Sequence, residues 1–272
     1  MSPEQGYFTY ECVDGEQEGV RARIASDAQR ALGGDLSEGI AQGESVQGGS
    51  AGKARVAAFD FDGTSMDGNS PVRLVLYLIK KRMLPNVVAL RIGLWALRYK
   101  LRLPQNEAWV RGMVFTAFEG KPVAEVNRFL SDFYDEDIAS RFRPLADEAM
   151  KRHRQAGDVV LMVSATFEPI IERMMQFHPV DGQVSTRMRI APNGTYTRRV
   201  EGKPVEGTEK LVAIERWCNE RFGAGNWELA YAYGDHHSDR PMLEAAEHPF
   251  AVDPDNPLMR TAKAKGWPVL DW

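Results

Sequence analysis

Two aspartates stand two residues apart where an apolar segment ends, in the sequence Asp60-Phe61-Asp62-Gly63-Thr64. The apolar residues 56–59 before them predict a buried β-strand that runs into a loop. Residues two apart on a strand point to the same side, so both carboxylates are expected to face one site. Neighbouring buried carboxylates repel each other, and such a pair persists where a divalent cation neutralises it or where one acid holds a proton to donate. The alternative is an Asp-Gly turn with solvated acids.

Further polar side chains stand at the end of a predicted strand or at the start of a predicted helix. Ser164 ends the second long strand, where its hydroxyl can hydrogen-bond an oxyanion. Lys210 lies at the start of a helix, where its ammonium and the helix N-terminus both attract a dianion. Asp235 and Asp239 follow another strand and open the next helix, a position suited to holding magnesium.

The elements that must position these residues alternate between strand and helix patterns. After the first strand, strands are expected over 158–166, 228–235 and 250–253, and helices over 169–177, 208–222 and 238–247. This alternation predicts an α/β fold with a mostly parallel sheet and helices on both faces. Ligands bind such sheets at the carboxyl ends of the strands, which is where the polar residues lie.

Two segments interrupt the alternation. Residues 183–200 contain two β-rich runs around Asn193-Gly194, which suits a tight turn, and predict a hairpin extension of the sheet. The stretch after the first strand has a helical pattern over 71–101, 105–118, 123–133 and 137–155. The predicted division is a catalytic core over 55–68 and 156–272, an inserted helical cap over 69–155, and a mostly disordered acidic leader over 1–54.

Composition limits the classes of protein. With 43% hydrophobic and 26% charged residues, the 272-residue chain is typical of a soluble globular protein, and its net charge of −4 excludes a dominant basic field for nucleic acid. Residues 1–55 hold nine acids and five bases and few large apolar side chains, which predicts disorder there. Cys12 and Cys218 are expected to be free thiols. No long apolar run or signal-peptide layout occurs, so a cytoplasmic location is expected.

In its order of acid pair, hydroxyl, lysine and second acid pair, the chain resembles the haloacid dehalogenase superfamily of aspartate-nucleophile phosphatases. The resemblance runs from about Arg55 to the C-terminus and is tightest in AAFDFDGT, VLMVSAT and the stretch that begins YAYGDHHSD. That last stretch and the helical insertion are similar to subfamily IB, which includes phosphoserine phosphatases and phosphatidylglycerophosphatase-like enzymes. The resemblance implies a Rossmann-like core with an inserted helical cap.

The resemblance also implies a covalent mechanism. Asp60 corresponds to the nucleophile that attacks phosphorus, and Asp62 to the acid that protonates the leaving alcohol and then activates water. An acid at position 62 favours a phosphatase over the ATPase branch of the superfamily, which has threonine there, and over the metal-free dehalogenases. Phosphomutases share the acid pair and stay an alternative.

The same resemblance assigns the phosphate and the metal. The residues expected to hold the phosphoryl group are Gly63, Thr64, Ser164 and Lys210. The expected Mg²⁺ ligands are Asp60, Asp62 through its backbone carbonyl, Asp235 and Asp239. His236 and His237 lie between the last two acids, but an aspartate-rich oxygen site favours a hard cation over zinc.

The start of the cap bears on the substrate. In phosphoserine phosphatases an acid shortly after the first motif reads the substrate ammonium, and the corresponding position here is near Asn69. No acid occurs from Gly68 to Asn106, which argues against serine phosphate. The same stretch carries eight bases among apolar residues, namely Arg73, Lys80, Lys81, Arg82, Arg91, Arg98, Lys100 and Arg102. Such a segment can lie on an anionic membrane surface, or it can pack its apolar faces internally and leave a solvated basic face.

The sequence therefore predicts a magnesium-dependent phosphomonoester hydrolase that acts through an aspartyl-phosphate on a small-molecule or lipid substrate. Within that class, a phosphoserine-type enzyme is one alternative, and peripheral contact with the inner membrane surface through the cap goes with the lipid alternative. A non-catalytic module that binds phosphate or docks to a membrane is the alternative from another class. The sequence does not indicate an oligomeric state.

Overall fold

The computed structural model describes residues 52–83 and 114–272. The expected disordered leader up to residue 51, the thiol of Cys12 and the expected helices across 84–113 lie outside these residues, as does half of the basic stretch. In the part of the chain that is described, no helix is both long and apolar enough to cross a bilayer.

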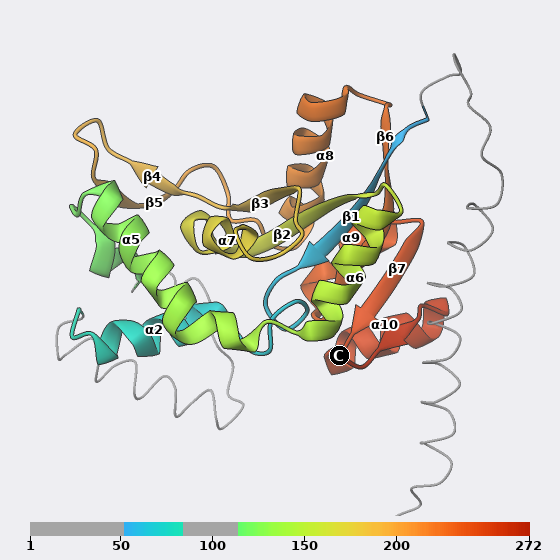
Figure 1. Ribbon diagram of the computed structural model, residues 1–272, viewed down its shortest axis with the longest axis horizontal. Coiled ribbons are helices and arrows are strands. Elements are labelled where there is room, and N and C mark those ends of the chain that lie inside the picture. Colours follow the sequence, from blue (N-terminus) through green and yellow to red (C-terminus); the bar gives the residue numbers. More distant parts are fainter. Residues whose placement is uncertain (1–51, 84–113) are drawn as a thin grey trace, which may run out of the picture.

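Within the described residues, six parallel strands form the main sheet in the order β3-β2-β1-β6-β7-β8 (Figure 1). The strands are β1 (Ala54–Asp60), β2 (Val159–Phe167), β3 (Gly182–Thr186), β6 (Trp227–Gly234), β7 (His248–Val252) and β8 (Val269–Leu270). The chain leaves β1 toward β2 on one side and reaches β6 on the other. The carboxyl ends of these three strands therefore meet at the switch point where α/β sheets bind ligands, and the predicted parallel sheet is confirmed.

Helices cover both faces of the sheet, because apolar side chains alternate along β1. Val56 and Ala58 belong to the apolar cluster of one face, and Ala57 and Phe59 to that of the other. The first face packs against α8 (Thr208–Phe222), α9 (Arg240–Ala245) and α10 (Asn256–Lys265). The second packs against α6 (Pro144–Gln155) and α7 (Glu168–Met175). The buried thiol of Cys218 on α8 is free, as expected.

Two C-terminal elements were not predicted, α10 and β8. The signals for α10 are present in the sequence: the side chain of Asp255 accepts a hydrogen bond from the backbone N–H of Leu258 at 2.8 Å, and Gly266 ends the helix in the left-handed region. The expected helix over 238–247 begins instead as a short 3₁₀ turn, η3 (His237–Asp239), and continues as α9.

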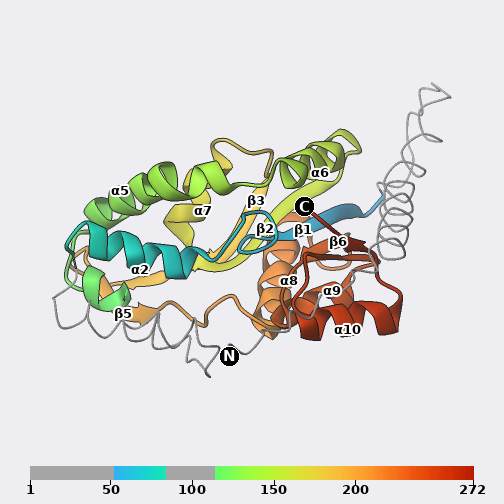
Figure 2. The same ribbon diagram turned by 90° about the horizontal axis from the view of Figure 1, so that it is seen from below.

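The cap elements lie at one end of the molecule, away from α8 and α10 (Figures 1 and 2). They comprise α2 (Ser70–Lys80), a helical stretch at 114–118, α5 (Val123–Phe133), a π-helical turn η1 (Tyr134–Ile138) and a 3₁₀ turn η2 (Ala139–Arg141). The ring of Tyr77 on α2 packs against Phe129 and Phe133 of α5, with both centroid distances at 5.2 Å. This aromatic contact fixes α2 beside α5.

The prediction of one helix over 137–155 is wrong. The backbone of Phe142 and Arg143 is extended, and Pro144 starts α6 because proline has no N–H to donate and its fixed φ suits the first helical position. The α6 helix then packs on β2 of the main sheet. Its His153 bridges two core residues, with Nδ1 at 2.8 Å from Asp158 and Nε2 at 2.9 Å from the hydroxyl of Tyr233.

The predicted hairpin turn at Asn193-Gly194 is present, but the hairpin does not extend the main sheet. Only Gly182–Thr186 joins that sheet, whereas β4 (Met188–Ile190) and β5 (Tyr196–Val200) form a separate two-stranded sheet. Met188 and Tyr196 are buried in the same apolar cluster as the cap helices, and Pro122 pairs with Thr195 just before α5. The hairpin leaves the main sheet because its apolar side chains are buried against the cap.

Candidate active site

At the switch point, a buried lysine contacts one aspartate at the end of β1 and another in the turn after β6. Lys210, in the first turn of α8, donates a hydrogen bond to Asp60 Oδ1 and another to Asp239 Oδ1, the latter at 2.5 Å. All three side chains are almost fully buried, with Asp60 at 5%, Lys210 at 4% and Asp239 at 1% exposed. The parallel topology brings together these residues, which are far apart in the sequence, as predicted from their positions at strand ends and helix starts.

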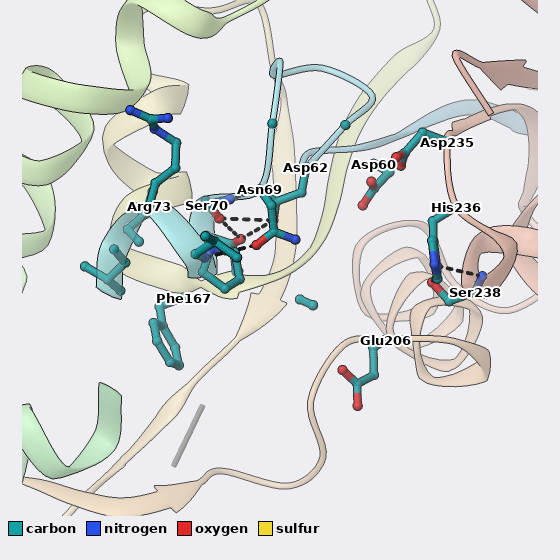
Figure 3. A pocket seen from close by; sticks show the side chains of 18 of the residues that line it. Asp60, Asp62, Asn69, Ser70, Arg73, Phe167, Glu206, Asp235, His236 and Ser238 are labelled. Atoms are coloured by element: carbon teal, nitrogen blue, oxygen red, sulfur yellow. Dashed lines mark hydrogen bonds between the residues drawn. The ribbon is translucent and has the colours of Figure 1, made fainter. Parts of the chain in front are cut away.

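Three aspartates gather around this lysine. Carboxylate oxygens of Asp60, Asp235 and Asp239 lie within 4.8 Å of one another, and Figure 3 shows Asp60 and Asp235 side by side. Asp60 ends β1, Asp235 follows β6 and Asp239 ends η3. A set of carboxylate oxygens this close fits a hard divalent cation such as Mg²⁺. The side chain of Asp62, whose backbone carbonyl is the expected ligand, is not in this group.

The electrostatics of the cluster follow from burial and from crowding of like charges. Burial, together with Asp239 and Asp235, raises the pKa of Asp60 well above its ordinary value, although Lys210 opposes the change. Burial and Asp239 likewise raise the pKa of Asp235 to about 6. Burial alone lowers the pKa of Lys210, but Asp239 and Asp60 outweigh it and raise this pKa above the ordinary value. Burial and crowding therefore disfavour the charged forms of these acids, and a bound cation would offset that effect.

Gly63 and Thr64 shape the loop after β1 against Asp235. The hydroxyl of Thr64 is fully buried and lies 3.2 Å from Asp235 Oδ1 and 3.4 Å from Asp60 Oδ2, so it orients the acids. Gly63 has φ +77°, and a Cβ atom there would lie 2.0 Å from Asp235 Oδ2. The glycine therefore allows both the left-handed backbone and the close approach of Asp235.

We expect Gly63→Ala to lower phosphate release by about 100-fold, because the new methyl group displaces the carboxylate of Asp235. Gly120→Ala is the matched control, since Gly120 has a similar φ of +73° but nothing within 4 Å of its Cβ position. Initial rates of phosphate release and melting temperatures of both variants test this. Equal rates in the two variants would contradict the role given to the contact with Asp235.

The carboxylate of Asp62 faces the start of the cap. Its Oδ1 accepts the backbone N–H of Ser70 at 2.5 Å, and its Oδ2 lies 3.0 Å from the hydroxyl of Ser70 and 2.7 Å from that of Thr166 (Figure 3). Burial raises the pKa of Asp62, and the hydrogen bonds from Thr166 and Ser70 oppose the change. The metal-binding role expected for the backbone carbonyl of Asp62 stays a prediction.

Ser164 lies on β2 behind the residues that line the site. It is fully buried, and its hydroxyl oxygen accepts the backbone N–H of Thr166 at 3.0 Å. The residues of β2 that line the cavity are Ala165, Thr166 and Phe167. The phosphate-binding role expected for Ser164 stays a prediction.

The site opens into a cavity of about 640 Å³ between the core and the cap, a size suited to a small ligand. Lining residues that the sequence did not single out are Ser70, Thr166, Phe167, Glu206 and Ser238. Arg73 also lines the cavity, and its guanidinium is held by both carboxylate oxygens of Asp137 in η1. The motif Asn69-Ser70-Pro71 carries the signal for a helix N-terminus, but nothing in it indicates a contact with Asp62.

Fold and site together define an enzyme of the α/β class with an aspartate and a lysine at the switch point beside a carboxylate cluster, an arrangement suited to phosphoryl transfer. The family model for haloacid dehalogenase-like hydrolases matches residues 57–244, and the chain belongs to this family.

Several curated relatives of the chain are phosphatases by name. It is 28% identical over 231 residues to a histidinol-phosphatase of Neisseria meningitidis, a match that covers 80% of this chain and 98% of that protein. It is 27% identical over 219 residues to a phosphoserine phosphatase of Mycobacterium tuberculosis, covering 79% of this chain and 70% of the relative. With the family established, the chain is a phosphatase that hydrolyses phosphomonoesters.

Solved structures share the fold. A protein with unknown function from Bordetella pertussis has a TM-score of 0.71 and 25% identity, covering 80% of this chain and 99% of that one. A phosphoserine phosphatase solved as an analogue of its phospho-aspartyl intermediate has a TM-score of 0.51 and 18% identity, covering 82% and 94%. This second likeness shows a common fold.

Proposed function

We propose that this phosphatase is Mg²⁺-dependent, uses Asp60 as its nucleophile, and acts on a small-molecule phosphomonoester. The observation that carries the proposal is the buried contact of Asp60 with Lys210 inside the carboxylate cluster. A nucleophile for phosphorus must sit beside positive charge, because the transferred group spreads negative charge over its oxygens. Lys210 supplies one such charge, and Mg²⁺ held by Asp60, Asp235 and Asp239 would supply the other by neutralising the phosphoryl oxygens.

The proposed reaction has two steps, each with its own bond changes. In the first, an oxygen of Asp60 forms a bond to phosphorus while the bond to the substrate oxygen breaks, and that oxygen takes a proton from Asp62. In the second, Asp62 accepts a proton from water as the water oxygen attacks the aspartyl-phosphate, which releases phosphate and restores Asp60. Splitting one displacement into two lowers the barrier for each, and one acid serves both steps.

We expect removal of Mg²⁺ by a chelator to abolish phosphate release, and added Mg²⁺ to restore it. The ion should also raise the melting temperature, because a ligand that binds only the folded state stabilises that state, in this case by relieving repulsion among the acids. An Asp235→Asn variant should lose most of this thermal shift. Full activity in the presence of chelator, or the same thermal shift in the variant, would contradict the assigned metal site.

Histidinol phosphate is the substrate we propose first. The histidinol-phosphatase of Neisseria meningitidis matches this chain over 98% of its own length. Among the described lining residues, the strongly basic side chains are Lys210 and Arg73, and carboxylates of the protein hold both. A substrate carboxylate such as that of phosphoserine would meet no unengaged ammonium or guanidinium from these two residues, whereas histidinol phosphate carries no carboxylate.

The lipid alternative depends on the basic stretch of the cap, half of which lies outside the described residues. On α2 and just after it, Arg73 is held by Asp137, and Lys81 pairs with Glu136 at 2.9 Å. Leu74, Val75 and Leu78 are buried. These contacts support internal packing of α2 against α5 and η1, with part of its positive charge balanced by the protein.

A substrate panel tests the proposal. It contains histidinol phosphate, phosphoserine, a sugar phosphate, phosphatidic acid and phosphatidylglycerophosphate, each with Mg²⁺ and with Asp60→Asn alongside. We expect the highest kcat/KM on histidinol phosphate and no release by the variant. A preference for phosphoserine or for a lipid would overturn the proposal that histidinol phosphate is the substrate. Exchange of phosphate between sugar positions without release would favour a phosphomutase. No release from any member would favour a phosphate-binding module.

We also propose that, among the described residues, the cap consists of residues 69–83 and 114–141 together with the β4–β5 hairpin. The packing of α6 on β2 and the burial of Met188 and Tyr196 among the cap side chains support this division.

A further inference from the structure

Two hydroxyl residues from different parts of the fold converge on the side chain of Asp62. Ser70 is the first residue of α2 in the cap, and Thr166 lies near the end of β2 in the core. Both are almost fully buried, at 1% and 2% exposed, while Asp62 lines the cavity. Neither residue belongs to the motif order that identifies the catalytic residues.

Three oxygens form a closed triangle at this point. Asp62 Oδ2 lies 3.0 Å from Ser70 Oγ and 2.7 Å from Thr166 Oγ1, and the two hydroxyl oxygens are 2.5 Å apart. The two hydroxyl hydrogens can fill only two of these three contacts. Asp62 Oδ2 therefore accepts either from both hydroxyls or from one of them, which in turn accepts from the other.

The other carboxylate oxygen is held as well. The backbone N–H of Ser70 donates to Oδ1 at 2.5 Å. With both oxygens engaged on the side of α2 and β2, rotation of the carboxyl group would break several hydrogen bonds at once. The same contacts turn the carboxylate of Asp62 away from the acidic cluster that contains Asp60 and toward the start of α2 (Figure 3). In an in-line displacement, the leaving oxygen lies on the side of phosphorus opposite the attacking oxygen of Asp60.

We propose that Ser70 and Thr166 are positioning residues that hold Asp62 in the orientation in which it protonates the leaving oxygen. This inference rests on the proposed function. When the bond between phosphorus and the ester oxygen breaks, the proton passes from Asp62 to that oxygen while Asp60 gains the phosphoryl group. Neither hydroxyl exchanges a bond with the substrate.

The nature of the leaving group separates this role from simple structural support. An alkoxide leaves slowly unless it is protonated, whereas p-nitrophenolate leaves readily as an anion. The constant kcat/KM covers only the steps up to departure of the leaving group, so it does not include the later attack of water. A positioning role for the proton donor should therefore change kcat/KM for an alkyl phosphate and hardly change it for p-nitrophenyl phosphate.

The experiment compares Thr166→Val, which keeps the shape but removes the hydroxyl, with Thr166→Ser, which restores it. We expect Thr166→Val to lower kcat/KM on β-glycerol phosphate by about 30-fold, within the range that general acid catalysis contributes, and on p-nitrophenyl phosphate by less than about 3-fold. Thr166→Ser should recover most of the loss. Ser70→Ala should also lower kcat/KM more on β-glycerol phosphate than on p-nitrophenyl phosphate. The factor should be smaller, because the backbone N–H of residue 70 still donates to Asp62.

A double-mutant comparison tests whether Thr166 acts through Asp62. In an Asp62→Asn background, Thr166→Val should have no further effect on β-glycerol phosphate, because the proton donor is already lost. Equal losses on both esters, or the full loss in the Asp62→Asn background, would overturn the inference while the proposed function stands. A wild-type protein that releases no phosphate from either ester would overturn the proposed function and this inference with it.

Discussion

Asp60→Asn should lower phosphate release by about 10⁴-fold or more, because removal of a covalent nucleophile leaves only binding and electrostatic effects. An amide keeps the shape of the side chain but attacks phosphorus poorly. The variant should also trap no phosphate on the protein when a labelled substrate is quenched in acid. Rate assays and the acid quench together measure whether the covalent step depends on this residue.

The fold should tolerate this change. The amide removes one of three crowded acids and keeps a hydrogen-bond acceptor for Lys210, so the melting temperature should equal or exceed that of the wild type. Asp67→Asn is the matched control, since Asp67 lies in the same loop with its side chain 73% exposed. Activity of Asp60→Asn close to that of Asp67→Asn would show that another group is the nucleophile.

Lys210→Met should remove both activity and much of the stability. The methionine fills a similar volume but leaves the buried carboxylates of Asp60 and Asp239 without their ammonium partner. Breaking a buried ion pair from one side costs about 3 kcal/mol or more of unfolding free energy. Denaturant unfolding should show this loss in the absence of metal, and Mg²⁺ should recover part of the stability but none of the activity.

Lys203→Met provides the control for this prediction. Lys203 lies seven residues earlier and pairs with Glu209, but its side chain is 73% exposed, so its loss should change stability by less than about 1 kcal/mol. If Lys210→Met unfolded at the same denaturant concentration as Lys203→Met, the buried cluster would not depend on the lysine. If it kept full activity, the assigned role in holding the phosphoryl group would be wrong.

The positions of Asp60, Lys210, Asp235 and Asp239 followed from sequence because each is set by a local rule. In each case, a polar residue follows the end of a buried strand, or a charged residue lies at the start of a helix. Parallel strands then carry these ends to one edge of the sheet, whatever the detailed packing. For the same reason, the strands β1, β2, β6 and β7 and the helices α7 and α8 were predicted to within about two residues at each end.

The hairpin, the division between α6 and the cap, and the setting of Asp62 did not follow from sequence. The hairpin turn at Asn193-Gly194 is a local feature, but whether its strands join the main sheet depends on where Tyr196 is buried. The helical pattern of 137–155 continues across Pro144, and only the tertiary structure shows that the part after Pro144, α6, packs on β2 of the main sheet.

What the sequence determined by itself is the order of catalytic side chains along the chain and the edge of the sheet that they share, since both depend on strand and helix ends. Tertiary structure alone decided how Asp62 is held. Ser70 and Thr166 are 96 residues apart, and their hydroxyls meet at 2.5 Å only because α2 begins against the end of β2. No periodicity or turn signal encodes such a contact, because it depends on the relative placement of two elements that pack against each other through many other residues.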